Sequence, residues 1–471
     1  MQQSGWIKNV FRSFVLLAIL VLWGCNRPVT PVATPQVEST GVSQVTSTPT
    51  FPPVVNPTSP VTRTPPTSPT SGLRPFPDTT GGIFVFNDQL ATSGMTEEQF
   101  AFAATHYAGT QKVTRADAAH LRQYNPGFLV LHYRLGQALG RSMPDDSCEP
   151  GNDLLNIIQG DEWVPEWPGE YNVLEEWFYH WNGSRVFNCQ YGHYLMNLDG
   201  TGWRDWWSAQ VIQQLQENEA DGLFADSYNI PSYGFTWKPP LPEVDEAFEQ
   251  EWATRQHAFT DFIQERFAGT WKWIPNIGSY ITTRDPSDYS NTDGVMIEGF
   301  AEWGGGSYFD PTDWQLQMDR LLRLSQGWKI ILLQNYPNAE DTSERLFLLA
   351  SYLLVKGEHT YINMDIGEEP EWFPEYQIDL GNPVDALPAQ ISAFLQPGSD
   401  VYVRRYARGM VYVNPFSETR RIQPPDGYLL VQPQGGGILP PDGKPAGSLL
   451  TTVVPSLELQ GYQAAIFINS Q

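Results

Sequence analysis

Apolar and polar residues alternate with two different periods between residues 76 and 397. Short, continuous apolar runs are separated by longer stretches in which apolar residues recur every three or four positions. Continuous runs are typical of strands in a parallel sheet covered on both faces, and the longer period is typical of amphipathic helices. The predicted strands are 83–87, 128–133, 194–199, 222–228, 272–276, 294–300, 329–334 and 360–363, and the predicted helices are 97–107, 114–123, 203–218, 244–267, 312–325 and 342–355. Eight strands that alternate with helices predict the α/β class and a (β/α)8 TIM barrel.

The pattern changes after residue 397. Short strand-like segments separated by turn residues cover 401–406, 410–413, 428–431 and 464–468, and no helical period fits between them. Several short strands without helices are typical of antiparallel sheets. The sequence therefore predicts a small C-terminal antiparallel β domain, residues 398–471, packed on a barrel of residues 76–397.

The first 25 residues are typical of an export signal. Lys8 and Arg12 precede an apolar stretch, residues 14–23, that is too short for a comfortable membrane span. The sequence Leu-Trp-Gly-Cys at 22–25 resembles the lipobox of bacterial lipoproteins, in which the cysteine is lipidated and becomes the mature N-terminus. This resemblance implies an extracytoplasmic protein that is lipid-anchored to the bacterial membrane through Cys25. An ordinary signal peptide and an uncleaved anchor remain as alternatives.

Residues 26–75 are rich in proline, threonine and serine and contain little apolar surface. Such a composition cannot form a core, and its prolines favour extended conformations. About 50 residues at roughly 3.1 Å each would reach on the order of 150 Å when extended. We therefore expect a disordered tether that holds the folded part of the chain away from the membrane.

Charge and cysteine content narrow the classes of partner. Residues 1–75 carry a net charge of +4. Because the whole chain carries −25, residues 76–471 carry −29. Such an acidic segment repels nucleic acid and anionic lipid, and its charge suits a neutral or cationic polymer as a substrate. The need for solubility alone explains the acidic charge equally well. Cys148 and Cys189 either pair in the exported protein or are two separate buried thiols. No motif indicates a metal or another cofactor, and we expect a monomer.

Two predicted strands end in a carboxylate, at Asp226 and at Glu298. The C-terminal ends of barrel strands are where TIM-barrel enzymes build their active sites. Two carboxylates on different strands can flank one bond, which is the arrangement that glycoside cleavage needs. The alternatives are that Asp226 caps a helix and that Glu298 is a salt-bridged structural acid.

Three segments resemble the barrel glycoside hydrolases. Asp199 at a strand end, Trp-Arg-Asp-Trp at 203–206 and the strand 221–226 resemble a pattern in relatives of α-amylase and α-galactosidase and in a family described only as glycosyl hydrolases of unproven activity. The segment 294–300 is similar to the second carboxylate strand of that last family. The resemblance covers about residues 80–365, and it implies that Asp226 is the nucleophile and the second strand's carboxylate the acid/base.

Elementary chemistry suggests the same roles. A nucleophile must stay ionised, and Arg134 could supply a cation if it faces the barrel mouth. A general acid must stay protonated near neutral pH, and the apolar neighbours of Glu298, such as Met296 and Phe300, are expected to raise its pKa. The reverse assignment of the two roles remains open.

Seven further residues are candidates for contact with a substrate. They are Asp199, Arg134, His132, Trp177, Trp303, Tyr228 and Asn335. Asp199 could orient a substrate hydroxyl or an arginine, or cap the next helix, and His132 is as easily structural. The seventeen tryptophans include several in predicted loops, where an indole stacks on a sugar ring or simply fills the space between loop and barrel.

The sequence thus predicts an extracytoplasmic glycoside hydrolase that acts on a polysaccharide or oligosaccharide through two carboxylates. One alternative is a non-catalytic carbohydrate-binding surface lipoprotein on the same barrel. A solute-binding lipoprotein and another hydrolase chemistry are further alternatives, but a serine hydrolase would need a GxSxG motif, which is missing from the sequence. The deciding observation is whether Asp226 and Glu298 converge on one open site.

Overall fold

The computed structural model describes residues 73–140, 156–159, 162–165, 173–367 and 369–469. They belong to one unit of the chain, Leu73–Gln471. The predicted export signal, Cys25 and almost all of the predicted tether lie outside the described residues. Within the described ranges, no helix is both long and apolar enough to cross a lipid bilayer.

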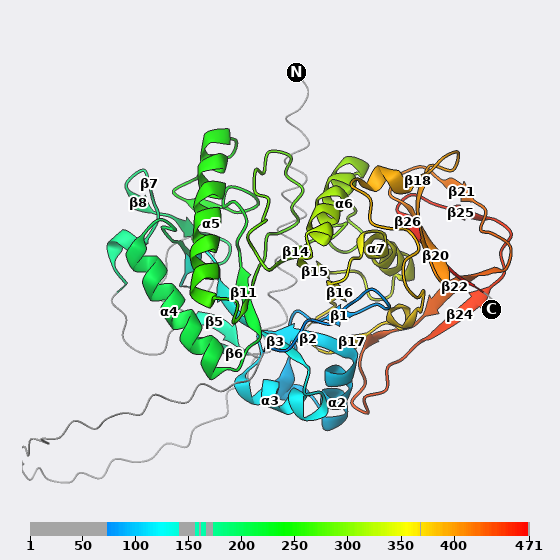
Figure 1. Cartoon of the computed structure of the whole chain (residues 1–471), viewed down its shortest axis with the longest axis horizontal. Coiled ribbons are helices and arrows are strands. Elements are labelled where there is room, and N and C mark those ends of the chain that lie inside the picture. Colours follow the sequence, from blue (N-terminus) through cyan, green and yellow to red (C-terminus); the bar gives the residue numbers. More distant parts are fainter. Residues whose placement is uncertain (1–72, 141–155, 160–161, 166–172, 368, 470–471) are drawn as a thin grey trace, which may run out of the picture. The chain divides into compact units, whose positions relative to one another are not determined.

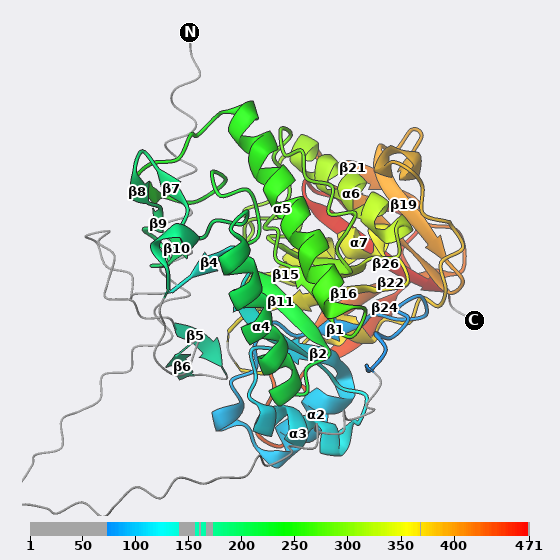
Figure 2. The same cartoon turned by 60° about the vertical axis from the view of Figure 1, so that its left-hand side comes forward.

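Eight parallel strands form a barrel sheet in the spatial order β13-β11-β3-β2-β1-β16-β15-β14 (Figures 1 and 2). Their bounds are β1 Val85–Phe86, β2 Tyr107–Gln111, β3 Leu129–Leu135, β11 Gly222–Asp226, β13 Lys272–Pro275, β14 Gly294–Glu298, β15 Ile330–Asn335 and β16 Thr360–Met364. The two end strands meet at a parallel bridge between Asn276 and Met296, and the Ile277 N–H donates to the Met296 carbonyl oxygen at 3.0 Å. The predicted (β/α)8 barrel is therefore confirmed as a nearly closed sheet.

Within the part of the chain that the structure describes, six α-helices cover the outside of the barrel. They are α2 Glu97–His106, α3 Arg115–Tyr124, α4 Thr201–Glu217, α5 Glu246–Phe267, α6 Pro311–Gln326 and α7 Thr342–Val355. Thr96 forms a capping box with Gln99 at the start of α2, and Asp310 caps α6, which begins with a proline. The connection between β13 and β14 contains no helix, and it includes Asn276 and Gly278.

One of the predicted barrel strands was wrong. Residues 194–199 contain β10, Tyr194–Leu195, which belongs to a separate antiparallel sheet, β12-β9-β10-β4. The barrel strand that sequence reasoning missed is β2, which follows α2 without a loop and whose sequence, Tyr-Ala-Gly-Thr-Gln, has no apolar run. A side chain at Gly109 would come within 2.5 Å of the Leu129 carbonyl oxygen, so the small residue that hides this strand is required by the strand spacing.

Short strands make up the segment between β3 and α4. They are β4 Ala138–Leu139, β5 Asn156–Gln159, β6 Glu162–Pro165, β7 His180–Trp181, β8 Ser184–Arg185, β9 Phe187–Asn188 and β10; β12 Trp237–Lys238, from the β11–α5 connection, pairs with β9. β5 pairs with β6 and β7 with β8 as hairpins. This segment is the Trp-rich interruption of the alternating strands and helices.

The C-terminal part is an antiparallel β structure, as predicted. A six-stranded sheet has the order β18-β19-β20-β26-β22-β24, and two further pairs are β21-β25 and β17-β23. Their bounds are β17 Glu371–Trp372, β18 Leu395–Gln396, β19 Val401–Tyr406, β20 Gly409–Asn414, β21 Arg420–Ile422, β22 Tyr428–Gln434, β23 Gly437–Ile438, β24 Ser448–Thr452, β25 Leu457–Leu459 and β26 Gln463–Asn469. Helix α7 is almost wholly buried because it packs against both β16 and this sheet. The exact bounds of the two predicted domains stay a prediction.

The barrel interior contains its own apolar cluster, and its strand positions fix which side chains face the mouth. Its members are Phe76, Phe86, Leu129, Leu131, Phe224, Ile274, Met296, Ile330, Leu332 and Tyr361. Side chains on a strand alternate between faces, so a residue two positions after an interior residue also points inward. This places Asp226, Asn276 and Glu298 at the C-terminal mouth, whereas His132 and Arg134 point outward.

A buried pair of acids, Glu302 and Glu344, holds the loop that follows β14. Glu344 accepts the Gly306 N–H at 2.5 Å and the Asn338 N–H at 3.1 Å. Glu302 is 1% exposed, and neither of its carboxyl oxygens has a well-formed hydrogen bond within the described residues. Burial, and next the charge of Glu344, raise the pKa of Glu302 to about 9. Glu302 is therefore protonated more readily in the folded protein than in the unfolded chain.

This raised pKa predicts how stability depends on pH. The folded state binds a proton at Glu302 that the unfolded state releases above a pKa of 4.5, so stability falls as pH rises from about 4.5 to about 9. We expect Glu302→Gln to remove part of this loss and to stabilise the protein by roughly 2–4 kcal/mol more at pH 8 than at pH 5. Urea unfolding of both proteins at the two pH values measures the difference. Equal stability differences at both pH values would contradict the prediction.

Candidate active site

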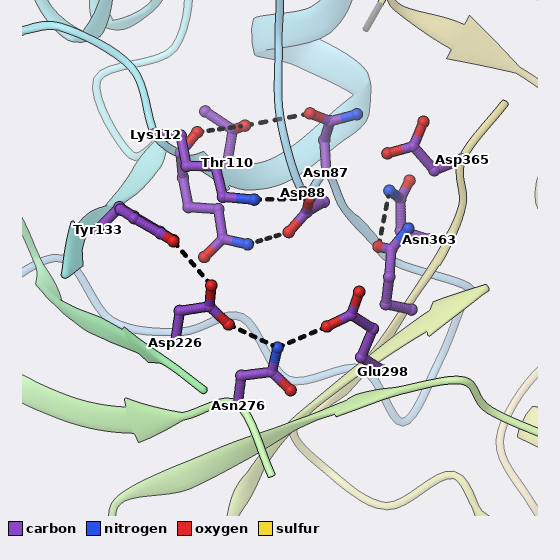
Figure 3. A network of polar contacts seen from close by, with 12 residues as sticks. Asn87, Asp88, Thr110, Lys112, Tyr133, Asp226, Asn276, Glu298, Asn363 and Asp365 are labelled. Atoms are coloured by element: carbon purple, nitrogen blue, oxygen red, sulfur yellow. Dashed lines mark hydrogen bonds and ion pairs between the residues drawn. The ribbon is translucent and has the colours of Figure 1, made fainter. Parts of the chain in front are cut away.

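The C-terminal ends of all eight barrel strands, or the residues directly after them, bear polar side chains. In strand order these include Asp88 after β1, Lys112 after β2, Tyr133 in β3, Asp226 ending β11, Asn276 after β13, Glu298 ending β14, Tyr336 after β15 and Asp365 after β16. Figure 3 shows most of them around one space, with Asp226 and Glu298 on either side of Asn276. The two predicted catalytic carboxylates are thus brought together.

Asn276 connects the two carboxylates directly. Its Nδ2 donates to Asp226 Oδ1 at 2.9 Å and to Glu298 Oε2 at 2.6 Å. These two distances limit the separation of the accepting oxygens to about 5.5 Å. The carboxyl groups of retaining glycosidases are about 5–5.5 Å apart, and those of inverting ones about 6.5–9.5 Å apart. This upper limit lies below the range of inverting enzymes and is compatible with the retaining arrangement.

The orientation of the Asn276 amide is fixed by a third contact. Asn276 Oδ1 accepts the Gly278 N–H at 3.0 Å, which identifies the other end of the amide as the nitrogen. An amide nitrogen can only donate. Both Asp226 Oδ1 and Glu298 Oε2 must therefore be hydrogen-bond acceptors, whereas Glu298 Oε1 has as its partner the Tyr336 hydroxyl, which can either donate or accept.

Asp226 is half-buried and surrounded by donors. In addition to Asn276, the Tyr133 hydroxyl donates to Oδ2 at 2.7 Å and the Ser227 N–H donates to Oδ1 at 2.7 Å. Ser227 has a φ of 56°, in the left-handed region, and this turn directs its N–H back toward the carboxylate. Donors on both oxygens stabilise the charged form of a carboxylate. Both oxygens of the Asp226 carboxyl group are therefore held in place by donors.

Glu298 is accessible to solvent at the mouth, although protein surrounds it on the remaining sides. Its other oxygen, Oε1, lies 2.8 Å from the Tyr336 hydroxyl. Desolvation, and next the charge of Asp226, raise the pKa of Glu298, while the hydrogen bonds from Asn276 and Tyr336 oppose this rise. The expected direction of the shift agrees with the structure, but its polar partners differ from the apolar setting that the sequence indicated.

The cation at the mouth is Lys112, not Arg134. Lys112 Nζ lies 3.0 Å from Asp88 Oδ2 and 5.2 Å from the centre of the Tyr133 ring. The charges of Asp88, Asp226 and Glu298 all act to raise its pKa, although desolvation acts in the opposite direction. Lys112 has a φ of 63°, a conformation that is uncommon outside glycine.

Arg134 and His132 contact helix α4 on the outside of the barrel. Arg134 is 2% exposed and donates to the side chain of Gln214, and His132 Nε2 lies 3.2 Å from the same Gln214 oxygen. Burial and the charge of Arg134 lower the pKa of His132 well below its usual value. The expectation that these two residues face the substrate is therefore corrected, because strand alternation turns them away from the mouth.

Three other predicted contact residues also lie away from the carboxylate pair. Asp199 is exposed and forms ion pairs with Arg255 at 3.1 Å and Arg204 at 3.6 Å, so it orients arginines and does not cap α4. Tyr228 is fully buried and donates to the Gln256 carbonyl oxygen. Trp177 is buried against other indoles, including Trp206 at 5.4 Å.

Asn335 and Trp303 are neighbours of Glu298 in different ways. Asn335 follows Gln334, which pairs with Glu298 in the sheet, and Trp303 lies in the loop that follows Glu298 in the chain. Asn335 ends β15, is 1% exposed and donates to the Asn363 carbonyl oxygen, which makes it part of the barrel wall. Trp303 is half-buried in the loop after β14 and packs edge-on against Phe309 at 4.7 Å. A contact of Trp303 with substrate stays a prediction.

Sequence reasoning missed Asn276, Lys112 and Tyr336. Asn276 was inside a predicted strand, and the signal that could have found it is its position two residues after an interior apolar residue, Ile274. Lys112 was missed because β2 itself was missed. Tyr336 had no signal, since it lies beyond the end of its strand.

Cys189 is disulfide-bonded. Both other cysteines of the sequence, Cys25 and Cys148, lie outside the described residues. The pairing of Cys189 with Cys148 therefore stays a prediction.

Comparison with known proteins gives one family match. The model of hypothetical glycosyl hydrolase family 15 matches residues 122–410, which is more than half of the chain. No curated protein matches the sequence. Similar solved structures include the maltogenic α-amylase AmyB from Thermotoga neapolitana, which is 11% identical over 82% of this chain and 98% of that chain, with a TM-score of 0.40. An α-amylase from Geobacillus thermoleovorans is 12% identical over 83% of this chain and 98% of that chain, with a TM-score of 0.35. The GH36 α-galactosidase AgaA from Geobacillus stearothermophilus is 10% identical over 83% of this chain and 56% of that chain, with a TM-score of 0.40.

Proposed function

Since the chain belongs to hypothetical glycosyl hydrolase family 15, we propose that it hydrolyses O-glycosidic bonds of a polysaccharide or oligosaccharide with retention of configuration. Asp226 is the nucleophile and Glu298 the acid/base in this proposal. The observation that carries it is the Asn276 amide, which bonds to both carboxylates and limits their separation to about 5.5 Å. The raised pKa of Glu298 and the donors around Asp226 support this order of roles over the reverse.

In the first step, a carboxylate oxygen of Asp226 attacks the anomeric carbon. The bond from that carbon to the leaving oxygen breaks, its electron pair stays on the leaving oxygen, and this oxygen takes the proton from Glu298 Oε1. The Asn276 amide occupies Oε2 as a donor, so Oε1 is the oxygen that can deliver the proton. The products of this step are a glycosyl ester on Asp226, an ionised Glu298 and a free alcohol.

In the second step, water replaces Asp226. Glu298, now a carboxylate, removes a proton from the water while its oxygen attacks the anomeric carbon. The bond from the carbon to Asp226 breaks and the aspartate leaves as a carboxylate. Glu298 is protonated again, and the sugar is released with its original anomeric configuration.

The experiment that tests this function is a hydrolysis screen followed by NMR of the products. A purified protein beginning near residue 73 would be incubated with a panel of polysaccharides and aryl glycosides, and the first-formed anomer of a cleaved substrate would be assigned. The proposal expects cleavage with retention. An inverted first product would overturn the retaining mechanism. Binding of a carbohydrate without cleavage would favour the non-catalytic lipoprotein.

Loss of Asn276 is expected to misplace both carboxylates. We expect Asn276→Ala to lower kcat by about 10²-fold, because small misplacements of reacting groups cost rates of this order. The same change removes donors from Glu298 and is expected to move the basic limb of the pH profile to higher pH. Steady-state kinetics across pH, with thermal unfolding as a control for folding, measures both effects. Unchanged kinetics in a folded variant would refute this role.

Tyr336→Phe is expected to change the pH profile with little effect on the maximal rate. The Tyr336 hydroxyl stabilises the ionised form of Glu298 and so lowers its pKa. Without it, the pKa of Glu298 rises and the protonated acid persists to higher pH. The basic limb of kcat/KM should therefore move to higher pH. A shift toward lower pH would show that Glu298 is not the acid.

The cellular location belongs to the same proposal. The lipobox-like sequence ending at Cys25 and the proline-rich segment after it support an exported lipoprotein whose barrel is tethered to the bacterial membrane. Expression of the full chain in a bacterium with an alkyne-bearing palmitate should label the protein, and Cys25→Ser should abolish the label. Equal labelling of both proteins, or none of the parent, would reject lipidation.

A further inference from the structure

Two acids form the wall of the mouth across from the catalytic pair. Asp88 follows β1 and Asp365 follows the neighbouring strand β16, and they are 9% and 7% exposed. In Figure 3 the Asp365 carboxyl group lies on the side of the mouth occupied by Asn87 and Asp88. A third acid, Glu371, is 4% exposed beside Asp365 and accepts the Ile366 N–H at 3.0 Å.

A buried acceptor without a donor lies in the same wall. Gln111 is 1% exposed, and its amide nitrogen donates to Asp88 Oδ1, which fixes the orientation of the amide. Gln111 Oε1 has no hydrogen-bond partner among the described residues. A buried acceptor of this kind costs stability unless a ligand donates to it. The group that this wall lacks is therefore a hydrogen-bond donor.

The charges of the wall are only partly compensated. Lys112 Nζ lies 3.0 Å from Asp88, and its attraction extends to Asp226 and Glu298 on the other side. Asp365 lies near Asp88, forms a hydrogen bond with Glu371 and is also reached by the charge of Lys112. One ammonium group, that of Lys112, therefore acts on four carboxylates, Asp88, Asp226, Glu298 and Asp365, and compensates them only in part.

We propose that the wall formed by Asp88, Gln111 and Asp365 is a subsite for a positively charged amino group, so that the sugar bound next to the catalytic pair is an amino sugar. This inference rests on the proposed hydrolase function and names its substrate class. An ammonium group would donate to Asp365, Asp88 and Gln111 Oε1 and would add positive charge where Lys112 compensates the acids only in part. A uronic acid would instead bring a further negative charge among these carboxylates.

The electrostatics of the free protein agree with this assignment. Burial, and next the charge of Asp88, raise the pKa of Asp365 to about 7. A nearby cation stabilises the ionised form and would reverse this shift. An ammonium ligand would therefore stabilise the ionised form of Asp365.

A matched pair of small ligands tests the proposal without knowledge of the sugar. Tris is a trihydroxy ammonium ion below neutral pH, and pentaerythritol is its neutral analogue with a hydroxyl in place of the ammonium group. We expect Tris to bind at least about 10-fold more tightly than pentaerythritol in calorimetry or ligand-observed NMR at pH 6.5. In Asp365→Asn, which keeps the acceptor for the Gly367 N–H, we expect the preference to fall to about 2-fold or less.

Asp226→Asn is the matched control, because it removes a charge on the opposite side of the mouth. It should retain most of the preference for Tris. If Asp365→Asn does not fold, Asp88→Asn should also lower the preference. Equal affinity for both ligands, no measurable binding of Tris, or a preference lost in Asp226→Asn as much as in Asp365→Asn would overturn the proposal. Because these ligands are bound and not cleaved, the outcome is independent of whether the protein proves to be a hydrolase.

Discussion

Replacement of Asp226 by alanine is expected to lower kcat on any substrate by at least about 10⁴-fold, because the covalent intermediate cannot form. The half-buried carboxylate leaves a space next to the anomeric carbon that the donors Tyr133 and Asn276 still line. A small anion can occupy that space. Azide should therefore restore cleavage of aryl glycosides with activated leaving groups.

The product of azide rescue identifies the role of the residue. Azide attacks from the side that Asp226 occupied and should form a glycosyl azide with the opposite anomeric configuration to the substrate. Asp199→Ala is the matched control, since Asp199 is an exposed strand-end candidate whose contacts are Arg204 and Arg255. It should retain full activity without azide. Wild-type rates in Asp226→Ala, or rescue with retained configuration, would exclude Asp226 as the nucleophile.

The barrel and the convergence of Asp226 and Glu298 at its mouth could be predicted because both depend on short-range patterns. Strands β11 and β14 are apolar to their last residue and end in Asp226 and Glu298, so the change from apolar to charged marks the mouth. Two-sided burial requires the apolar run, and chemistry at the mouth requires the charge. Both signals lie within a few residues of each other.

Other site residues depend on information that single segments lack. Arg134 and Lys112 are both cations near a strand end, and only the face of the strand decides which one reaches the mouth. Interior apolar residues such as Leu131 determine that face, and they are recognisable only once the register with neighbouring strands is known. The sequence therefore indicated that a cation was needed but assigned it to the wrong strand.

The missing strand β2 illustrates a second limit. Gly109 in β2 contacts the Leu129 backbone so closely that no side chain fits. The other residues of β2, Tyr-Ala and Thr-Gln, form no continuous apolar run. The requirement comes from β3, which lies further along the chain. A tertiary contact thus removed the local signal, and the eight expected strands included 194–199 in place of β2.

Replacement of Glu298 by alanine is expected to lower kcat on natural substrates by about 10²- to 10⁴-fold, the range of general acid catalysis. The loss should depend on the leaving group. An oxygen that departs as an unactivated alkoxide needs the proton from Oε1, whereas a dinitrophenolate does not. Dinitrophenyl glycosides should therefore still form the ester with Asp226 at a rate close to that of the parent protein.

The second step separates this role from a structural one. Without Glu298, water lacks its base, so the glycosyl ester on Asp226 should accumulate and be visible by mass spectrometry of the intact protein after a burst of dinitrophenolate. Azide, which needs no base, should speed its release. The loss of a charge near Asp226 cannot by itself produce this pattern, because it would slow all leaving groups alike. Equal losses for activated and unactivated substrates, with no accumulated ester, would remove Glu298 from the acid/base role and leave the Asn276-linked carboxylates as a binding pair.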